Sequence, residues 1–401
     1  MQHFTLSERA LQRRLKRHFL KEQHDYFAVC TPGFEDVLLR EVQELPGVDR
    51  ARVDAGGVTF TGPVDALYHA NLLLSSANRV LLRVAEFSAS TTPMLFDQTS
   101  RQRWELFVKD GARVRIVSSA RKSKLNHHGR ITETLAAGMN ACLEPLGVTF
   151  TPTQEDAYDL ELHVRLHRDR CTLSVNTSGE HLHRRGWRVL TSQAPIRETL
   201  AAAILRRTGL ENEPGRVLID PFCGSGTFLV EAAHLLSGYP PGAARPFAFE
   251  RLPFFQESKW HRFRREAVQR AAPVRPRLLG FDLAQDVVDL ARQNAAKAGV
   301  DGAIELAHAD ALSIDLSSFA GEEGTTLVAN LPYGERLGDR QQVDALARRF
   351  AAKLNAKCSG WRVALVTGRA EHTRDLRLND RDVLHFRNGG LKVALTSGVI
   401  G

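Results

Sequence analysis

The spacing of hydrophobic positions changes near residue 195 and indicates two parts of different architecture. In the first part, short apolar strands are mixed with helices of amphipathic period, a pattern typical of an α+β fold. We expect strands at 26–30, 58–60, 80–84, 112–118, 159–165 and 171–176, with helices at 34–45, 64–74 and 131–143 and another around Trp104. The basic residues 1–24 predict a partly helical extension.

In the second part, strands and helices alternate along the chain, which predicts a mostly parallel sheet covered on both faces. Two final apolar runs, 383–386 and 391–396, flank Asn388-Gly389-Gly390, and this is a hairpin signal. A terminal hairpin added to a parallel sheet predicts a mixed sheet of seven strands. The expected strands before the hairpin are 216–220, 278–282, 303–307, 325–329 and 361–367, and the expected helices are 198–207, 227–236, 285–298 and 343–354.

Composition narrows the class of protein. The chain has 401 residues, 43% of them hydrophobic and 25% charged, which excludes a collagenous or largely disordered protein. No apolar run reaches the length of a membrane-spanning helix, and the N-terminus lacks the apolar stretch of a secretory signal. Five widely spaced cysteines form no Cys-x-x-Cys pair. We therefore expect a cytoplasmic protein in its reduced state, with no membrane association and no bound metal.

The charge distribution suggests a polyanionic partner. The formal net charge is +8 and the isoelectric point is about 9.4. Basic residues gather at 121–128, 181–188 and 259–277, and together these clusters favour nucleic acid. Each cluster alone could be ordinary solvated surface. Trp187, inside the second cluster, belongs to a residue type that stacks on unpaired bases.

A glycine-rich turn after an expected strand is the first signal of a ligand site. Residues 217–227 read V-L-I-D-P-F-C-G-S-G-T, so the strand ends in Asp220, and Gly224 and Gly226 open a helix. The glycines permit close approach of a ligand, and the helix N-terminus offers free N–H groups to an anion. Leu229 occupies the third glycine position of a dinucleotide fingerprint, and no Gly-Lys-Ser/Thr follows, which argues against NAD and ATP.

Two more carboxylates follow strands in the same way. Asp282 ends the next expected strand, and Asp310 follows the one after it. Because ligands of open α/β sheets bind at the carboxyl ends of strands, acids at three successive strand ends indicate one site. Asp282 suits a ribose diol and Asp310 an adenine amino group, although either residue alone could cap a helix.

The fourth strand is followed by Asn330-Leu331-Pro332-Tyr333-Gly334, which resembles the Asn-Pro-Pro-Tyr turn of S-adenosylmethionine-dependent amino-methyltransferases. Further motifs are L-H-R-R-G-W-R at 182–188, A-P-I-R-E-T-L-A-A at 194–202 and R-N-G-G-L at 387–391. With them the chain resembles the THUMP-domain RNA guanine-N2 methyltransferases, in particular the N-terminal half of the bacterial 23S rRNA enzyme. The resemblance begins near Tyr26 and keeps the motifs in the family's order.

The resemblance implies a domain organisation. An α+β THUMP-containing RNA-binding domain is expected to precede a Rossmann-like class I methyltransferase domain of the α/β class. The implied parts are a basic extension at 1–24, a ferredoxin-like α+β part at 25–90, a THUMP domain at 91–178, a linker at 179–197 and the methyltransferase domain at 198–401. Residues 238–277 are expected to be an insertion, either facing the substrate or packed as a surface loop.

The resemblance also implies S-adenosylmethionine as the cofactor and S-adenosylhomocysteine as the product. Cys223 fits this site as a small residue and not as a nucleophile. The implied cofactor-binding residues are Thr199, Asp220, Phe222, Cys223, Gly224, Ser225, Gly226, Thr227, Asp282, Leu283, Asp310, Ala311 and Asn330. The expected RNA-binding residues are Arg121, Lys122, Lys124, His127, Arg184, Arg185, Trp187 and Arg188.

The implied catalytic residues are Asn330, Leu331, Pro332 and Tyr333. The side-chain oxygen of Asn330 and the backbone carbonyl of Leu331 can accept hydrogen bonds from an exocyclic amine and orient it toward a methyl sulfonium. Pro332 stiffens the turn, and Tyr333 can stack on an extruded base. Leu331 stands where the family commonly has proline. Because that position need offer only its carbonyl, we expect activity to be retained, without a metal or a covalent intermediate.

The leading hypothesis is methylation of guanosine N2 in structured RNA, most specifically 23S rRNA, by a monomeric enzyme. A tRNA guanine-N2 methyltransferase would use the same residues, and the insertion and residues 181–188 favour rRNA only weakly. An RNA-binding or ribosome assembly factor without catalysis is an alternative of another class. N7-guanine or N6-adenine methylation, DNA amino-methylation and NAD-dependent oxidation agree less well with the motifs.

Overall fold

The computed structural model describes residues 6–189, 196–213, 215–273, 277–321, 324–333 and 340–401. The chain divides into two compact units, and each is built from several segments. Unit 1 comprises Met1–Val29, Leu39–Leu182 and Pro246–Arg264, and unit 2 comprises Cys30–Leu38, His183–Arg245 and Arg265–Gly401. The expected linker at 179–197 is therefore divided between the units after Leu182.

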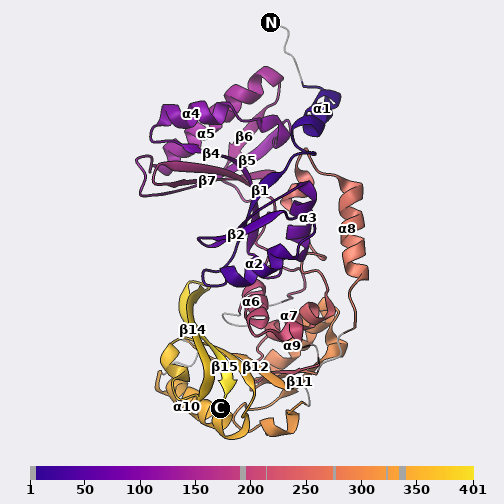
Figure 1. Ribbon diagram of the computed structural model, residues 1–401, viewed down its shortest axis with the longest axis vertical. Helices are drawn as coiled ribbons and strands as arrows, with labels where there is room; N and C mark the ends of the chain where they lie inside the picture. The colour runs from indigo at the N-terminus through magenta and orange to yellow at the C-terminus, as the bar shows by residue number, and fades with distance from the viewer. Residues whose placement is uncertain (1–5, 190–195, 214, 274–276, 322–323, 334–339) are drawn as a thin grey trace. The chain divides into compact units, whose positions relative to one another are not determined.

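Unit 1 is organised around an eight-stranded sheet with the strand order β2-β3-β1-β4-β8-β7-β5-β6 (Figure 1). The strands are β1 (His24–Val29), β2 (Arg50–Asp54), β3 (Gly57–Gly62), β4 (Arg79–Ser88), β5 (Ala112–Arg121), β6 (Phe150–Thr153), β7 (Leu160–His167) and β8 (Arg170–Asn176). Strands β1 to β4 pair antiparallel, whereas β5 pairs parallel with both β6 and β7.

The helices of unit 1 are α1 (Glu8–His18), α3 (Val64–Leu73), α4 (Thr92–Ser100) and α5 (His128–Leu143), with a 3₁₀ turn at Trp104–Leu106. Two further helices, α2 (Glu35–Gln43) and α8 (Glu257–Gln269), each contain a boundary between the units. The structure confirms the expected strands and helices of this part, except that the expected helix around Trp104 is a single 3₁₀ turn. It adds β2, β6, α4 and α8, which the hydrophobic pattern does not reveal.

Unit 2 contains the expected mixed sheet of seven strands, and the order is β11-β10-β9-β12-β13-β15-β14. The strands are β9 (Val217–Asp220), β10 (Leu278–Asp282), β11 (Ile304–His308), β12 (Thr325–Asn330), β13 (Arg362–Thr367), β14 (Leu378–Asn388) and β15 (Leu391–Ile400). The first five pair in parallel, and β15 lies antiparallel to both β13 and β14, so the predicted terminal hairpin is confirmed.

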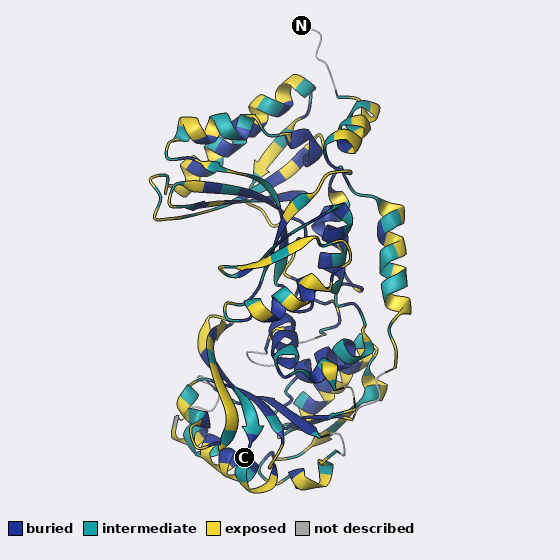
Figure 2. Cartoon of the chain, in the orientation of Figure 1, coloured by how far each residue is buried: buried dark blue, intermediate teal, exposed yellow. Residues whose placement is uncertain are grey.

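Helices cover both faces of the unit 2 sheet. On one face, α6 (Glu198–Arg207) and α7 (Thr227–Ser237) pack on alternate strand residues such as Leu218 and Val328. On the other, α10 (Arg340–Lys357) packs on the intervening residues, such as Ile219 and Leu327. Helix α9 (Gln285–Ala298) follows β10. Figure 2 shows α6 and the central strands as almost wholly buried, as expected for a parallel sheet covered on two sides.

Part of the expected insertion is core and not loop. Trp260 on α8 is fully buried in unit 1, where its ring lies 5.1 Å from Phe249 and 5.6 Å from Phe247. Tyr68 of α3 completes the cluster and accepts a hydrogen bond from the backbone N–H of Gln256. The packing of residues 246–264 thus favours the structural interpretation of this segment over the substrate-facing one. Across the described residues, no helix is both long and apolar enough to cross a membrane.

We predict that Trp260→Ala lowers the free energy of unfolding of unit 1 by about 3–5 kcal/mol, because it removes a buried indole and leaves a cavity. Chemical denaturation measures this change. His261→Ala, at the exposed neighbouring position, is the matched control and should change the free energy by less than about 0.5 kcal/mol. Equal effects of the two substitutions would show that α8 does not contribute to the core.

Candidate cofactor and catalytic site

Four polar residues follow four neighbouring strands at one edge of the unit 2 sheet. Asp310 follows β11, Asp282 ends β10, Asp220 ends β9 and Asn330 ends β12, and these strands are adjacent in that order. All four strands run parallel, so their carboxyl ends meet at the same edge. Adjacent strands lie about 4.8 Å apart, so the four positions span roughly 14 Å. The residues that the sequence predicts to act together are therefore neighbours.

The glycine turn connects β9 to α7 in left-handed backbone geometry. Gly224 and Gly226 have φ of 53° and 81°, and Gly226 is the N-cap of α7. A Cβ atom at Gly226 would lie 3.3 Å from the Cβ of Ala291 on α9. A larger residue would therefore be strained both by the positive φ and by this close contact. Cys223 is buried, and burial raises the pKa of its thiol well above the ordinary range. A protonated thiol agrees with a packing role for this residue.

Asp220 is a buried carboxyl that has no cation near it among the described residues. It is 1% exposed, and its Oδ1 accepts a hydrogen bond of 3.2 Å from the N–H of Phe222. Burial raises the pKa of Asp220 well above its ordinary value, and the neighbouring Asp282 carboxylate raises it further. A ligand ammonium group placed here would favour the ionised form, because an opposite charge offsets the cost of burial.

The Asp282 carboxylate ties the glycine turn to the loop after β10. Its Oδ2 accepts from the N–H of Gly224 at 3.0 Å, and its Oδ1 accepts from the N–H of Ala284 at 3.1 Å. Each oxygen keeps a second lone pair for a ligand hydroxyl. Leu283 beside it is 70% exposed, so its apolar side chain is available to the face of a planar ring.

The other predicted ligand residues are divided between surface and core. Asp310 is exposed, and its Oδ1 accepts from the N–H of Leu312. Ala311 is buried, and its carbonyl accepts from Lys353 of α10. Phe222 packs edge-on against Phe350 of the same helix.

The turn after β12 holds an unpaired buried oxygen. The Oδ1 atom of Asn330 is buried and has no hydrogen-bond partner among the described residues. The N–H of Leu331 donates to the carbonyl of Val366 at 3.0 Å, which fixes the turn to β13. In the described part of the chain, the Leu331 carbonyl itself accepts no hydrogen bond. Two acceptors at this point are therefore available to an amine donor. Residues 334–338, which continue the motif, lie outside the described residues, as do Ala194 and Pro195.

Tyr333 is buried, in contrast to a residue presented for base stacking. It is 3% exposed and packs with Val366 and Phe386, and its hydroxyl accepts a hydrogen bond of 2.9 Å from Nδ2 of Asn388. Gly368 lies against it, since a Cβ there would be 2.8 Å from the Cβ of Tyr333. In this conformation Tyr333 shapes the turn and is held by the terminal hairpin.

The Arg188 side chain is bonded to the glycine turn after β9, and this differs from its sequence-based assignment to an RNA-facing surface. Its Nε donates to Glu198 at 2.7 Å, Nη1 to the Ser225 hydroxyl at 3.3 Å and Nη2 to the Thr227 hydroxyl at 2.9 Å. From the other side, Asn294 donates to the Ser225 carbonyl and accepts from the N–H of Val189. The segment before α6 is thus bonded to the turn that the sequence assigns to the cofactor.

Arg185 and Trp187 are also interior residues, so neither side chain is available to RNA in this conformation. Arg185 is 3% exposed and pairs with the equally buried Glu231 of α7 at 3.2 Å. Trp187 is 4% exposed and packs with Val230 and Ala295. Of this cluster, Arg184 remains exposed.

The loop at 121–128 keeps its predicted exposure. Arg121, Lys122, Lys124 and His127 are all exposed in unit 1. Ser123 and Lys124 bond to Asp169 in the turn between β7 and β8, which brings Arg168 and Arg170 to the same tip. His127 also has a local role, because its Nδ1 accepts from the N–H of Arg130 at the start of α5.

The sequence does not identify three residues that hydrogen-bond within this region of unit 2: Glu198, Asn294 and Asn388. Each is buried, and the partners of Asn294 and Asn388 lie more than 50 residues away along the chain, whereas Glu198 binds Arg188 ten residues before it. Their only signal in the sequence is a polar residue on an otherwise apolar helix face or within the hairpin turn. Thr199, which the sequence does predict, is 1% exposed in the first turn of α6 beside Glu198. Within the described residues, no group of three or more His, Cys, Asp or Glu side chains could hold a metal ion.

Comparison with known proteins agrees with this geometry. Residues 185–397 match the family described as the RMKL-like methyltransferase domain, and residues 25–81 match the RlmL ferredoxin-like domain. A curated relative, ribosomal RNA large subunit methyltransferase K/L of Syntrophotalea carbinolica, is 32% identical over 381 residues. The alignment covers 92% of this chain and 53% of that protein, so the chain spans about half the length of the curated relative.

Solved structures show the same fold over nearly the whole chain. SMU.472, crystallised in complex with SAH, is 29% identical with a TM-score of 0.83, and the match covers 95% of this chain and 99% of that one. A possible methylase from Clostridium difficile 630 is also 29% identical, with a TM-score of 0.84 and the same coverage.

The fold and the strand-end site define a class I methyltransferase with a ferredoxin-like domain near its N-terminus. The family match covers more than half of the chain. The chain therefore belongs to the family of RMKL-like methyltransferase domains, as the motifs predict.

We predict that Arg188→Met lowers the free energy of unfolding of unit 2 by about 3 kcal/mol, because it leaves Glu198 buried without its cation. Burial already raises the pKa of Glu198, and Arg188 is the main group that lowers it. Without Arg188 the folded state should bind more protons than the unfolded state. The variant should therefore lose stability as pH rises, more steeply than the wild type.

Denaturation at several pH values measures this dependence. Arg188→Met with Glu198→Gln should remove the extra pH dependence. Arg292→Met, which breaks an exposed ion pair with Asp289 on α9, is the matched control and should cost less than about 1 kcal/mol. If the Arg188→Met variant alone kept the wild-type pH dependence, the account would be contradicted.

Proposed function

We propose that this chain transfers the methyl group of S-adenosylmethionine to N2 of a guanosine in structured RNA, with 23S rRNA as the favoured substrate. The observation that carries the proposal is the unpaired Oδ1 of Asn330, buried at the end of β12 beside the glycine turn of β9. A buried acceptor without a partner costs about 1–3 kcal/mol. A donor group of the substrate would remove that cost.

The residues at the strand ends fit S-adenosylmethionine. Asp220 is a buried carboxyl suited to the methionine ammonium, and Asp282 retains acceptor capacity for the ribose hydroxyls. Leu283 offers an exposed apolar face for adenine, with Asp310 available for its amino group. The complex of SMU.472 with SAH supports this choice of ligand.

The chemistry of the turn follows from its two acceptors. S-adenosylmethionine supplies an electrophilic methyl group on a sulfonium. A guanine N2 amine is a weak nucleophile, because its lone pair is delocalised into the ring. The Asn330 oxygen and the Leu331 carbonyl can each accept one of its N–H groups, so that the lone pair points at the methyl group and developing positive charge on nitrogen is stabilised. The proton can then leave to water.

The RNA contribution is assigned to unit 1. The ferredoxin-like match and the expected THUMP domain support an RNA-binding unit, and the exposed tip formed by Arg121, Lys122, Lys124 and His127 supplies positive charge for phosphates. We expect a monomer that acts in the cytoplasm without membrane association. The name of the rRNA methyltransferase relative favours 23S rRNA over tRNA.

We predict that Asn330→Ala lowers turnover at least about 100-fold, because the amine loses its side-chain acceptor. Affinity for S-adenosylhomocysteine should remain within about threefold of wild type, since Asn330 contacts the amine more than the cofactor. Methyl transfer to 23S rRNA and calorimetric titration measure the two effects. Persistent turnover would remove Asn330 from the mechanism.

We predict that Asp282→Ala weakens binding of S-adenosylhomocysteine by roughly 10- to 100-fold, because hydrogen bonds to a charged acceptor are worth about 1.5–3 kcal/mol each. Asp289→Ala, which removes an exposed carboxylate of α9, is the control and should bind as the wild type does. An unchanged affinity of the Asp282 variant would contradict the ribose assignment.

A further inference from the structure

The terminal hairpin extends beyond the parallel strands at the edge that holds the strand-end site. Thr367, the last residue of β13, pairs with Ala394 of β15, so residues 391–393 and their partners 386–388 continue past the end of β13. At about 3.4 Å per residue, they carry the turn of the hairpin roughly 10 Å farther. We call residues 385–393 the hairpin tip. Figure 2 shows β14, which supplies half of it, as a largely exposed strand.

The inner face of the hairpin tip packs against the turn after β12. Phe386 and Val393 are buried in the same cluster as Tyr333. Asn388 donates a hydrogen bond of 2.9 Å to the Tyr333 hydroxyl. These contacts hold the hairpin tip beside the turn whose Asn330 oxygen is proposed to receive the amine. A group bound on the outer face of the hairpin tip would therefore lie near the target nucleotide.

The outer face of the hairpin tip exposes positive charge. Arg387 and Lys392 are both exposed, and they lie directly opposite each other in the register of β14 and β15. His385, two residues before Arg387 and also exposed, shares this face. Arg387 donates one hydrogen bond to the Gly390 carbonyl at 3.0 Å, and its guanidinium has five N–H donors in all.

The opposed cations favour an anionic ligand. Lys392 makes no ion pair or side-chain hydrogen bond with any described residue. Like charges at directly opposite positions of two strands repel each other and destabilise the pairing. An anion bound between Arg387 and Lys392 would remove this repulsion.

Carboxylates near the hairpin tip do not balance its charge. Residues 383–401 contain no aspartate or glutamate. Residues 368–373, which follow β13 at the same edge, contribute the exposed Arg369 and Glu371. Arg369 is ion-paired with Asp344 of α10, and His372 also lies 2.9 Å from that carboxylate. Asp344 is therefore already neutralised, and the charge around the hairpin tip is positive.

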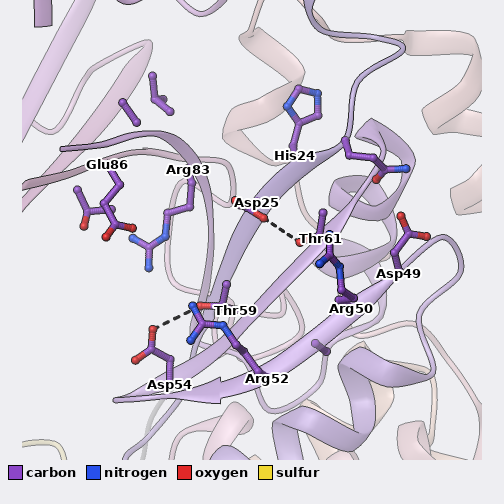
Figure 3. Close-up of a pocket in the computed structure, with 15 residues that line it drawn as sticks. His24, Asp25, Asp49, Arg50, Arg52, Asp54, Thr59, Thr61, Arg83 and Glu86 are labelled. Atoms are coloured by element: carbon purple, nitrogen blue, oxygen red, sulfur yellow. Dashed lines mark hydrogen bonds between the residues drawn. The ribbon is translucent and has the colours of Figure 1, made fainter. Parts of the chain in front are cut away.

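The polar cleft of unit 1 is a contrasting case. It has a volume of about 1010 Å³ and lies over β2, β3, β1 and β4. Two threonine hydroxyls of β3 donate to the carboxylates of Asp25 and Asp54 within it. The cleft has no excess of positive charge and does not suit a phosphate. Figure 3 shows its four carboxylates beside three guanidinium groups, from Asp25, Asp49, Asp54, Glu86, Arg50, Arg52 and Arg83.

We propose that the hairpin tip binds a backbone phosphate of the RNA strand next to the target guanosine, with Arg387 and Lys392 as its two ligands. Arginine offers a planar fork of donors and lysine a compact charge, and both bind phosphate. The hairpin tip thereby holds the strand while the turn after β12 receives the base. This inference rests on RNA as the substrate under the proposed function, and it names the surface of unit 2 that holds the RNA.

The test is filter binding of a radiolabelled 23S rRNA transcript by the complete chain, with S-adenosylhomocysteine present and over a series of KCl concentrations. For Arg387→Ala with Lys392→Ala, we expect roughly tenfold weaker binding at moderate salt. The slope of log K against log salt should become shallower by about 0.7, the contribution of one phosphate contact on a single strand. In methyl transfer, KM for the RNA should rise by a similar factor while kcat stays within about twofold.

Two further variants separate a charge effect from a structural one. Arg387→Lys with Lys392→Arg keeps both charges and should restore most of the affinity and the slope. Lys357→Ala with Arg377→Ala is the matched control, because it removes one lysine and one arginine that are exposed at the opposite edge of the same sheet. Lys357 ends α10 before β13 begins, and Arg377 precedes β14.

The outcomes distinguish this inference from the proposed function. Equal affinities and slopes for the two alanine double variants would overturn the role of the hairpin tip, and methylation of 23S rRNA by both would leave the proposed activity standing. Conversely, binding that depends on the hairpin tip in a chain that methylates no RNA would uphold the RNA surface and contradict the proposed activity.

Discussion

The site depends on the convergence of parallel strand ends. Parallel strands bring their carboxyl ends to one edge, and β11, β10, β9 and β12 are neighbours there. Strands β9, β10 and β12 are buried on both faces by alternate residues, so their register is fixed and the last residue of each has a defined position, whereas β11 is a largely exposed edge strand. Three carboxylates and an amide, separated by more than 100 residues of chain, are thereby placed within one cofactor's length of each other.

The same edge holds polar groups that the described residues leave without full hydrogen bonding. Asp220 is a buried carboxyl, and the buried Oδ1 atoms of Asn330 and Asn388 have no hydrogen-bond partner among the described residues, although Asn388 donates to Tyr333 through its Nδ2. Buried polar groups without partners are costly, so their concentration at one edge marks a place where a ligand completes the hydrogen bonding. The Arg188–Glu198 pair, by contrast, is satisfied, and it holds the hydroxyls of the glycine turn in place.

The sequence predicts the features that depend on residues close together in the chain. Alternation of strands and helices predicts the unit 2 sheet and its terminal hairpin, and acids after strands predict the site, because topology then brings them together. It does not predict β2 or α8. Strand β2 is a charged edge strand (R-A-R-V-D) without a clear apolar face, and α8 buries chiefly Trp260.

The sequence also misplaces three residues of the cluster at 181–188, namely Arg185, Trp187 and Arg188. Arginine next to tryptophan has the same local pattern in an RNA-binding surface and in a buried ion pair. Only the fold brings Glu231 to Arg185 and Glu198 to Arg188, and burial then decides the role. The buried Tyr333 is a related case, since nothing in the turn itself reveals that Asn388 of the terminal hairpin binds its hydroxyl.

Mass spectrometry of nucleosides tests the central claim most directly. Nucleosides from purified 23S rRNA and from tRNA would be compared between cells that carry the gene and cells that lack it. The account predicts loss of N2-methylguanosine from 23S rRNA alone. Loss from tRNA would keep the mechanism and change the substrate, whereas unchanged N2-methylguanosine in both pools would contradict the account.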